Sequence, residues 1–472
     1  MASASERLRR GLPATLSALA ARSPVLCVFV VALAVRVIAA VVIAVGWGGS
    51  LLLDDASYSQ LAEMAANGAV EDPYLQFLYE RTATLLVPIA GLYALFGPFE
   101  LLGQLYVALL GAATAALTAR LAMEIMDRRF ALFAGLVVAL LPSQILWSSL
   151  ILKDAAVWAV LSGLALVVAI AARSEGRRLA LMGGIAALLL GLLGFLRLHT
   201  LEVACVAGVL AVLAFPRPRP LARTAGAAVL LAVVPFAFGM GVAGSTFVAS
   251  SRDPGQQRVL NAIAADSAVV DAPAPATPDT TASQPAPAPT TPDKTTAPTA
   301  SATKPGKTPP STASATKPDK TPAPTATTPD AAPPAPAPAL DPLEETSTVG
   351  SSLSYLPAGV TVVALRPWPW ESSDTSLGVR MARAETIVWY PLLLLALVGL
   401  TSVWTHRRAL AFPVIAGGAI LALYGLAEGN LGTAFRHRGE LVWVVALLAA
   451  LGAERIFTWR GERHSPAAPE AA

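Results

Sequence analysis

The stretch "TATLLVPIAGLYALFG", residues 82–97, decides the membrane topology of this chain. It is apolar, but it is shorter than the roughly 20 residues that a helix needs to cross a bilayer, and it contains Pro88. If it crosses the membrane, every later segment changes side. If it lies along the membrane surface, every later segment keeps its side, and the positions of the basic residues can separate these two topologies.

The composition is that of an all-α polytopic membrane protein, because 55% of the residues are hydrophobic and only 14% are charged. The formal net charge of +3 is too small to indicate a nucleic-acid partner, so the expected partner is the lipid bilayer. Ten apolar runs are candidate membrane spans. They cover residues 25–45, 100–124, 131–150, 155–172, 179–196, 200–215, 222–243, 386–404, 409–427 and 441–457.

The basic residues favour the flat placement of residues 82–97. With that placement, the basic N-terminus, the C-terminus and most arginine clusters share one side, which the positive-inside rule assigns to the cytoplasm. We therefore expect a multi-pass protein of the cell membrane with both termini in the cytoplasm. The cytoplasmic arginines are then Arg128, Arg129, Arg173, Arg177, Arg178, Arg217, Arg219, Arg223, Arg407 and Arg408.

Four cations break this pattern in the short loops after the first one. Lys153, Arg197, Arg436 and Arg438 fall on the outer side, the last two in the loop "EGNLGTAFRHRGE", residues 428–440. Short translocated loops normally lack Lys and Arg, so these residues are expected to bind an anionic group or an acidic partner. The alternative is that they reach lipid headgroups by snorkelling.

The topology divides the chain into three parts. An N-terminal module, residues 1–243, has seven spans and a first outer loop at 46–99. An extracytoplasmic loop, residues 244–385, contains a linker of Pro, Ala and Thr at about 271–342, whose composition predicts disorder. The C-terminal module, residues 386–472, has three spans and the outer Arg-His-Arg loop.

Arg36 lies in the middle of the first predicted span. A charge at that depth is costly unless it has a partner. We expect Arg36 to pair structurally, with an acidic residue near the site as a candidate partner.

The first outer loop contains the acidic stretch "LLLDDASYSQLAEMAANG", residues 51–68. Either Asp54 or Asp55 could cap the helix that follows, but one cap does not require two acids. The order of an acid after the first span, a second acid, then Tyr58 and a closing Gly68 resembles the GT-C superfamily of integral-membrane glycosyltransferases. That superfamily includes protein mannosyltransferases, the bacterial aminoarabinose transferase and oligosaccharyltransferases.

The resemblance extends to about residue 200. A flat helix before the second span, the basic turn "DRR" at 127–129, and Pro142 followed by Ser148 or Ser149 and then Asp154 have counterparts in that superfamily. The resemblance implies a GT-C-like fold and the transfer of a sugar from a polyprenyl-phosphate donor. The acceptor would be a glycan, lipid or protein of the cell envelope on the outer face.

The resemblance also implies roles for the acids. Asp54 matches the leading acid of the superfamily and is expected to act as general base on the acceptor hydroxyl. Asp55 and Asp154 would orient the acceptor, tune the base or hold a divalent cation through their oxygens. Some members need a metal and others do not, so a metal held by Asp54 and Asp154 stays open.

The outer cations would bind the donor phosphate, because the planar guanidinium of Arg grips phosphate oxygens well. We expect the donor phosphate to contact Arg436, His437, Arg438, Arg197 and Lys153. The substrate or these arginines would be oriented by Tyr58, Glu428 and Asn430.

Two other functions are compatible with these residues. A lipid-linked glycan transporter or flippase would use the same cations to hold phosphate, but it would be expected to show two related halves with discontinuous helices. A polysaccharide polymerase or ligase of the cell envelope would consume diphosphate-linked donors.

Overall fold

Helices make up the ordered framework, and the residues that the structure describes contain no strand. The computed structural model describes residues 20, 22–214, 349–371, 377–427 and 431–463. All of them belong to one compact unit that excludes residues 273–335. The helices are α3 (Pro24–Trp47), α4 (Leu53–Ala66), α5 (Pro73–Arg81), α6 (Ala83–Phe96), α7 (Glu100–Ala122), α8 (Arg128–Leu140), α9 (Pro142–Trp147), α10 (Asp154–Ala171), α11 (Gly176–Gly194), α12 (Leu198–Ala214), α16 (Val349–Leu365), α17 (Leu377–Leu400), α18 (Arg407–Ala427) and α19 (Leu431–Arg463).

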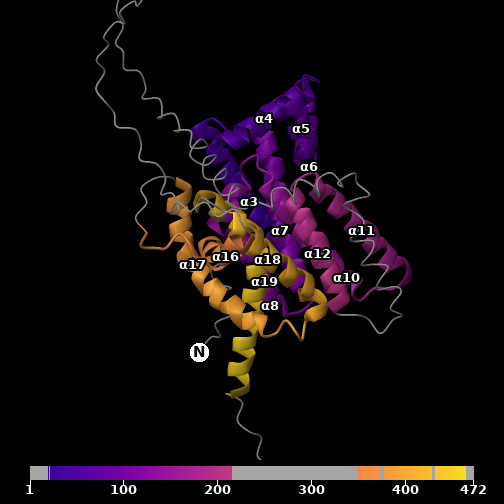
Figure 1. Cartoon of the computed structure of the whole chain (residues 1–472), viewed down its shortest axis with the longest axis vertical. Helices are drawn as coiled ribbons and strands as arrows, with labels where there is room; N and C mark the ends of the chain where they lie inside the picture. The colour runs from indigo at the N-terminus through magenta and orange to yellow at the C-terminus, as the bar shows by residue number, and fades with distance from the viewer. Residues whose placement is uncertain (1–19, 21, 215–348, 372–376, 428–430, 464–472) are drawn as a thin grey trace, which may run out of the picture. The chain divides into compact units, whose positions relative to one another are not determined.

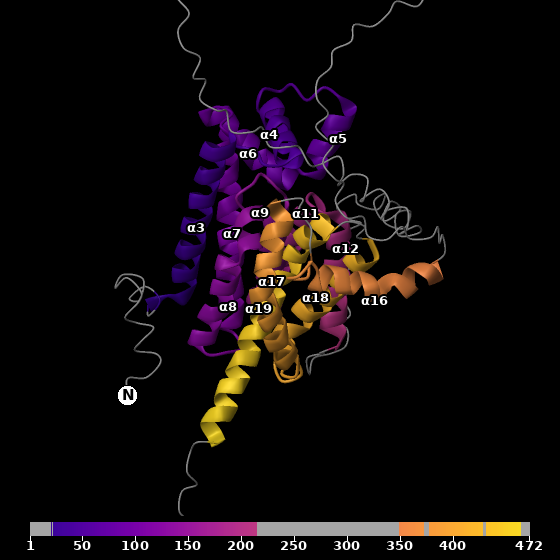
Figure 2. The same cartoon turned by 90° about the vertical axis from the view of Figure 1, so that its left-hand side faces the viewer.

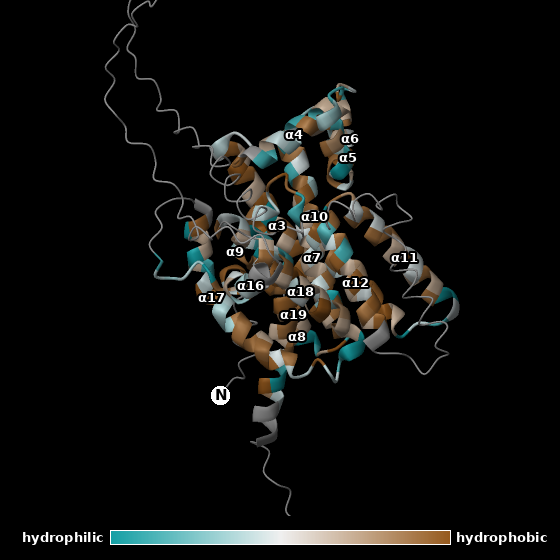
Figure 3. Ribbon diagram, in the orientation of Figure 1, coloured by the Kyte–Doolittle hydropathy of each residue, from teal (hydrophilic) through white to brown (hydrophobic). Residues whose placement is uncertain are grey.

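Seven of the described helices are long and apolar enough to cross a membrane: α3, α7, α10, α11, α17, α18 and α19. Hydrophobic residues predominate along them, whereas hydrophilic residues gather on α5 and in the turns (Figure 3). They match seven of the ten predicted spans. Of the other three, residues 200–215 form the shorter α12, residues 131–150 form two helices, and residues 222–243 lie outside the described part of the chain.

The predicted span over residues 131–150 is built from two helices, because Pro142 interrupts it. Proline has no N–H to continue the helix, and it pushes the preceding Leu141 into the extended conformation that ends α8. The carbonyls freed by the break accept hydrogen bonds from Arg36, with its Nη1 3.0 Å from the Ala139 oxygen and its Nη2 3.1 Å from the Val138 oxygen. The buried cation therefore caps the end of a helix, where the helix dipole favours positive charge, and no acid is its partner among the described residues.

The segment from residue 49 to residue 104 starts and ends at the same level of the helix bundle. The Ser50 hydroxyl after α3 lies 3.2 Å from the carboxylate oxygens of Glu100 in the first turn of α7, and Gln104 donates to the Gly49 carbonyl. Between them, α6 packs its buried Leu85, Leu86 and Ile89 in the core. Figures 1 and 2 show α4 and α5 at the upper end of the described unit. The two ends of this segment therefore lie side by side. The flat placement of residues 82–97 along a membrane surface stays a prediction.

The C-terminal helices pack at very short range. A Cβ placed on Gly399 of α17 would lie 2.0 Å from the Leu448 carbonyl oxygen of α19, and one on Gly452 would lie 2.0 Å from the Leu395 oxygen. Small residues allow such close approach between membrane helices. This contact fixes α19 against α17 and sets the position of the charged residues near the start of α19.

One element was not expected from the sequence. The segment 244–385 was interpreted as a single outer loop, but its end contains α16 and the first turns of α17. The α16 helix packs against α18, where a Cβ on Gly359 would lie 1.7 Å from the Gly425 carbonyl oxygen. The predicted linker at 271–342 lies outside the described residues.

Candidate functional site

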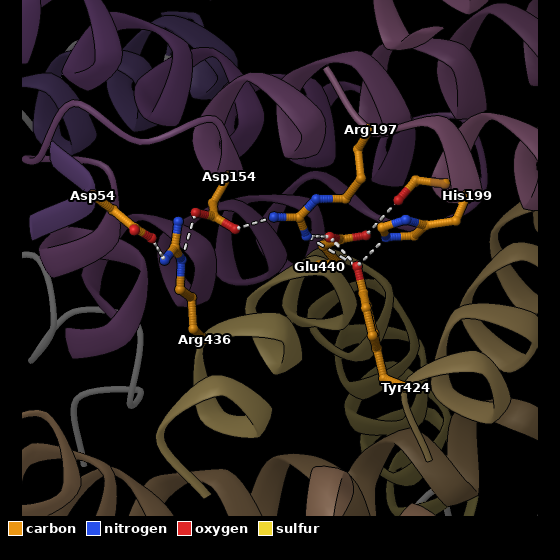
Figure 4. A network of polar contacts seen from close by, with 8 residues as sticks. Asp54, Asp154, Arg197, His199, Tyr424, Arg436 and Glu440 are labelled. Atoms are coloured by element: carbon orange, nitrogen blue, oxygen red, sulfur yellow. Dashed lines mark hydrogen bonds and ion pairs between the residues drawn. The ribbon is translucent and has the colours of Figure 1, made fainter. Parts of the chain in front are cut away.

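Five charged side chains form a continuous chain of ion pairs (Figure 4). Arg436 of α19 donates through Nη1 to Asp54 at 2.7 Å and through Nε to Asp154 at 2.8 Å. Arg197, just after α11, donates to the other oxygen of Asp154 at 3.0 Å and also to Glu440. The carboxylates and guanidinium groups alternate, so each buried charge has an opposite neighbour.

Local structure explains where the two aspartates stand. Asp54 lies in the first turn of α4 and Asp154 is the first residue of α10. Acidic side chains at these positions interact favourably with the positive end of the helix dipole. Exposure separates them, because the Asp54 side chain is 51% exposed and that of Asp154 is fully buried. Asp54 is therefore the carboxylate of this network that a substrate can reach.

The predicted outer loop at 428–440 is helical from Leu431 onward, and this changes the roles of its cations. Residues two positions apart on an α-helix point roughly 200° apart. Arg438 consequently faces away from Asp54 and lies between the rings of Trp389 and Phe435. The predicted clamp made of Arg436 and Arg438 together is wrong, because the helix separates them.

Arg438 belongs to a second buried network. Its Nη2 lies 3.2 Å from Glu385, which also accepts hydrogen bonds from the backbone N–H and hydroxyl of Ser143. Its Nη1 donates to the Arg366 carbonyl at 3.3 Å. The side chain is 1% exposed, so it ties α9, α17 and α19 together and is not accessible to a phosphate.

Arg197 is equally inaccessible. Its side chain is 3% exposed, and besides the two acids it donates to the hydroxyl of Tyr424 at 2.9 Å. Tyr424 in turn donates to Glu440 at 2.6 Å. The prediction that Arg197 contacts the donor phosphate is not supported by this geometry, because its guanidinium already donates to Asp154, Glu440 and Tyr424.

Asp55 has a structural position. Its carboxylate accepts hydrogen bonds from the backbone N–H groups of Leu51, Leu52 and Ala56 at 3.1, 2.9 and 2.9 Å, and the residue is 1% exposed. Burial raises the pKa of this carboxyl, and the three amides oppose that shift. The predicted catalytic role of Asp55 is therefore corrected to that of a cap at the start of α4.

Tyr58 and Lys153 lie beside the network without hydrogen-bond partners among the described residues. Burial, and then the charge of Asp54, raise the pKa of the Tyr58 phenol to about 12, so it stays protonated. Burial, and then the charge of Arg197, lower the pKa of the Lys153 ammonium to about 8. Both groups keep free hydrogen-bond donors close to Asp54 and Arg436.

The remaining predicted residues divide into two cases. His437 stacks on Tyr424, with ring centroids 4.3 Å apart and planes 13° apart, so it faces the inner part of the network. Glu428 and Asn430 lie outside the described residues. Sequence reasoning missed Glu385, which directly precedes the predicted span 386–404 and lies within α17. An acid at the edge of an apolar helix is itself a signal of a buried partner.

The two aspartates proposed as metal ligands do not fit a divalent cation in this arrangement. Arg436 lies between Asp54 and Asp154 and bonds to both, and Arg197 takes the second oxygen of Asp154. The described residues contain no cluster of three His, Cys, Asp or Glu side chains with metal-binding geometry. A guanidinium thus occupies the position that a metal would need.

No protein-family model, no curated protein and no solved structure matches this chain. The assignment of a function therefore depends on the geometry of the site.

Proposed function

We propose that this protein is a membrane glycosyltransferase that moves a sugar from a polyprenyl-phosphate donor to an acceptor hydroxyl on the outer face. The observation that carries the proposal is the contact of the partly exposed Asp54 with Arg436, which Asp154 holds from the buried side. This contact places a base that a substrate can reach, Asp54, beside a cation that is fixed in place, Arg436. A glycosyl transfer with a phosphate leaving group needs both.

In the proposed step, the acceptor oxygen attacks the anomeric carbon of the sugar and its proton moves to an oxygen of Asp54. The bond between the anomeric carbon and the phosphate oxygen breaks, and its electron pair leaves with the polyprenyl phosphate. A positioned carboxylate base contributes about 10² to 10⁴ in rate. The exposed side of Asp54 leaves room for an acceptor of the cell envelope.

The leaving phosphate gains negative charge that Arg436 is placed to stabilise. Its Nη1 and Nε serve the two aspartates, and within the described residues its Nη2 has no acceptor, which leaves donors for a phosphate oxygen. Lys153 adds an ammonium without an ion-pair partner in the described part of the chain. One such donor is worth about 3–4 kcal/mol where comparable groups have been removed from enzymes.

Asp154 and Arg197 are positioning residues in this proposal. Asp154 fixes the guanidinium of Arg436, Arg197 keeps Asp154 charged, and Glu440 holds Arg197 in place. A fixed dipole or ion pair costs no reorganisation when charge develops in the transition state. Tyr58, one turn after Asp54, presents a protonated hydroxyl that suits a hydrogen bond to the sugar or the acceptor.

The test is a transfer assay with the purified full chain in lipid nanodiscs. A panel of radiolabelled polyprenyl-phosphate pentoses and hexoses is offered with a cell-envelope acceptor fraction, and Asp54→Asn is the matched variant. We expect label in the acceptor with the native chain and a loss of at least about a hundredfold with the variant. In proteoliposomes, translocation of the lipid-linked sugar without transfer would indicate a flippase instead. Chain growth from a diphosphate-linked donor alone would indicate a polymerase or ligase.

A further inference from the structure

A basic cavity lies at the end of the bundle opposite Asp54. It has a volume of about 490 Å³ and is lined by Arg173, Trp404, Thr405, His406, Arg407 and Arg408. The helix α10 separates the two ends, because Asp154 starts it and Arg173 follows its last turn. Its 18 residues correspond to about 27 Å along the axis. The cavity is therefore remote from the candidate functional site.

Two turns between candidate spans form this cavity. Arg173 lies between α10 and α11. Trp404, Thr405 and His406 lie in the turn from α17 to α18, at the lower end of Figure 1, and Arg407 and Arg408 begin α18. These four helices are all long and apolar enough to cross a membrane. The cavity thus lies where the apolar part of the bundle ends, at the depth of lipid headgroups.

Positive charge is in excess around the cavity. Arg173 pairs with Glu124 at 2.8 Å, but the same carboxylate also accepts from Arg120, so one acid serves two cations. Arg455 donates to the neutral hydroxyls of Thr401 and Ser402. Arg408 makes no hydrogen bond or ion pair within the described part of the chain. An anion in the cavity would therefore meet Arg408 and also Arg173, whose acidic partner is shared with Arg120.

Trp404 gives the cavity an amphipathic edge. Its side chain is 72% exposed, and the guanidinium of Arg407 lies 5.8 Å from its ring centroid. Exposed tryptophans concentrate at membrane–water interfaces, where the ring contacts acyl chains and the indole N–H contacts headgroups. The N-terminal end of α18 lies at the same turn, and its helix dipole adds partial positive charge there.

We propose that this basic cavity binds the phosphate headgroup of an anionic phospholipid from the same bilayer. Arg407 and Arg408 contact the phosphate, Arg173 closes the cavity from the other turn, and Trp404 packs along the glycerol and upper acyl chains. A lipid is favoured over a free phosphate because the opening lies at the ends of four candidate spans and carries an exposed tryptophan. Basic pockets between membrane helices are known to bind such headgroups.

The test measures lipid binding by native mass spectrometry on the full chain purified in a neutral detergent. Dioleoylphosphatidylglycerol is titrated into the native chain, the double variant Arg407→Gln/Arg408→Gln and the control Arg128→Gln/Arg129→Gln, whose arginines are exposed at the start of α8. One saturable lipid is expected. Each basic residue near an anionic headgroup contributes about fivefold in affinity, so the cavity variant should bind roughly 30-fold more weakly. The control should bind as the native chain does.

Three outcomes would overturn the proposal. These are equal weakening in both double variants, equal binding of dioleoylphosphatidylcholine, and complete displacement of the lipid by millimolar inorganic phosphate, which would make free phosphate the ligand. If the cavity variant does not fold, brominated phosphatidylglycerol decides with the native chain. It should quench the fluorescence component that Trp404→Phe removes, and no quenching of that component would refute the site.

Discussion

Asp54 and Arg436, 382 positions apart in the sequence, form an ion pair with 2.7 Å between Oδ2 and Nη1. The pair joins the first turn of α4 to the first turns of α19, and so it brings residues from the N-terminal and C-terminal modules to one place. Asp154 holds the same guanidinium from the buried side. Of the two side chains, that of Asp54 is the more exposed. This difference in exposure distinguishes the proposed role of Asp54 from the roles of its buried neighbours.

Asp54 and Asp55 are adjacent, but substitutions at the two positions should have different effects. Asp54→Asn should lower transfer by about 10² to 10⁴ without changing stability much, because a half-exposed ion pair is worth about 1 kcal/mol or less. Asp55→Asn should lower the free energy of unfolding by roughly 0.5–2 kcal/mol, as removal of a helix cap does. Transfer assays and thermal unfolding in detergent measure both. Equal effects of the two variants on activity would contradict the assignment.

Asp154 should be the most sensitive residue of the network. Removing one member of a buried ion pair leaves an uncompensated charge and costs about 3–5 kcal/mol, and Asp154 is the shared partner of Arg436 and Arg197. Asp154→Asn should therefore reduce the yield of folded protein and its unfolding midpoint far more than Asp54→Asn. The comparison uses the same detergent and temperature ramp. A stable Asp154→Asn chain would show that the network is not needed for folding.

Hydropathy and the positive-inside rule predicted much of this arrangement. Seven spans and the meeting of Asp54, Asp154 and Arg436 at one end follow from them, because sidedness restricts which loops can meet. The roles of the cations could not be predicted in the same way. Arg438 pairs with Glu385 across 53 positions, and Arg36 donates to a carbonyl across 103 positions. Such partners depend on helix packing, which a single sequence does not encode in any local pattern.

The helical continuation of residues 431–440 was also missed for a physical reason. A cluster of charges next to an apolar run is typical of a loop when only hydropathy is considered. Here Arg436, Arg438 and Glu440 all have buried partners, so the charged turns stay helical inside the protein. The same packing explains why Arg436 and Arg438, both expected to hold phosphate, lie on different faces of α19.

Arg436 and Arg438 provide a matched pair of variants. Arg436→Gln should weaken donor binding and lower kcat/KM by about a hundredfold or more, because it removes a donor at the leaving phosphate. Arg438→Gln should instead leave Glu385 unpaired and lower stability, with an unchanged KM for the donor in the protein that folds. Donor titrations and unfolding curves separate the two effects. If Arg438→Gln raised the donor KM as strongly as Arg436→Gln, the different roles that we assign to the two arginines on different faces of α19 would be refuted.

Deprotonation of Lys153 should set an upper pH limit for the reaction. Its pKa in the folded chain is about 8, below the usual 10.5, so the folded state binds fewer protons than the unfolded state between these pH values. Stability should therefore rise as pH increases through this window, while the cation available to phosphate is lost. We expect kcat/KM for the donor to fall above about pH 8. Lys153→Arg should move this limit upward, and Lys153→Gln should lower kcat/KM throughout and abolish the limit. An unchanged limit in Lys153→Arg would exclude Lys153 as its source.

The two ends of the bundle should be accessible from opposite sides of the membrane. Ser57 is exposed on α4 near Asp54, whereas Arg128 and Arg408 are exposed at the starts of α8 and α18 at the other end. Single cysteines at these positions, in a chain whose buried Cys27 and Cys205 are replaced by Ala, can be labelled with a membrane-impermeant maleimide in sealed cells. Because the positive-inside rule assigns the arginine-rich end to the cytoplasm, Ser57→Cys should react in intact cells. Arg128→Cys and Arg408→Cys should react only after the cells are opened. If Ser57→Cys and Arg128→Cys were labelled from the same side, the chain between them would cross the bilayer an even number of times, so either α7 would not span it or the stretch 82–97 would cross as well. If all three showed the reverse sidedness, Asp54 would face the cytoplasm, and an acceptor on the outer face could not reach it.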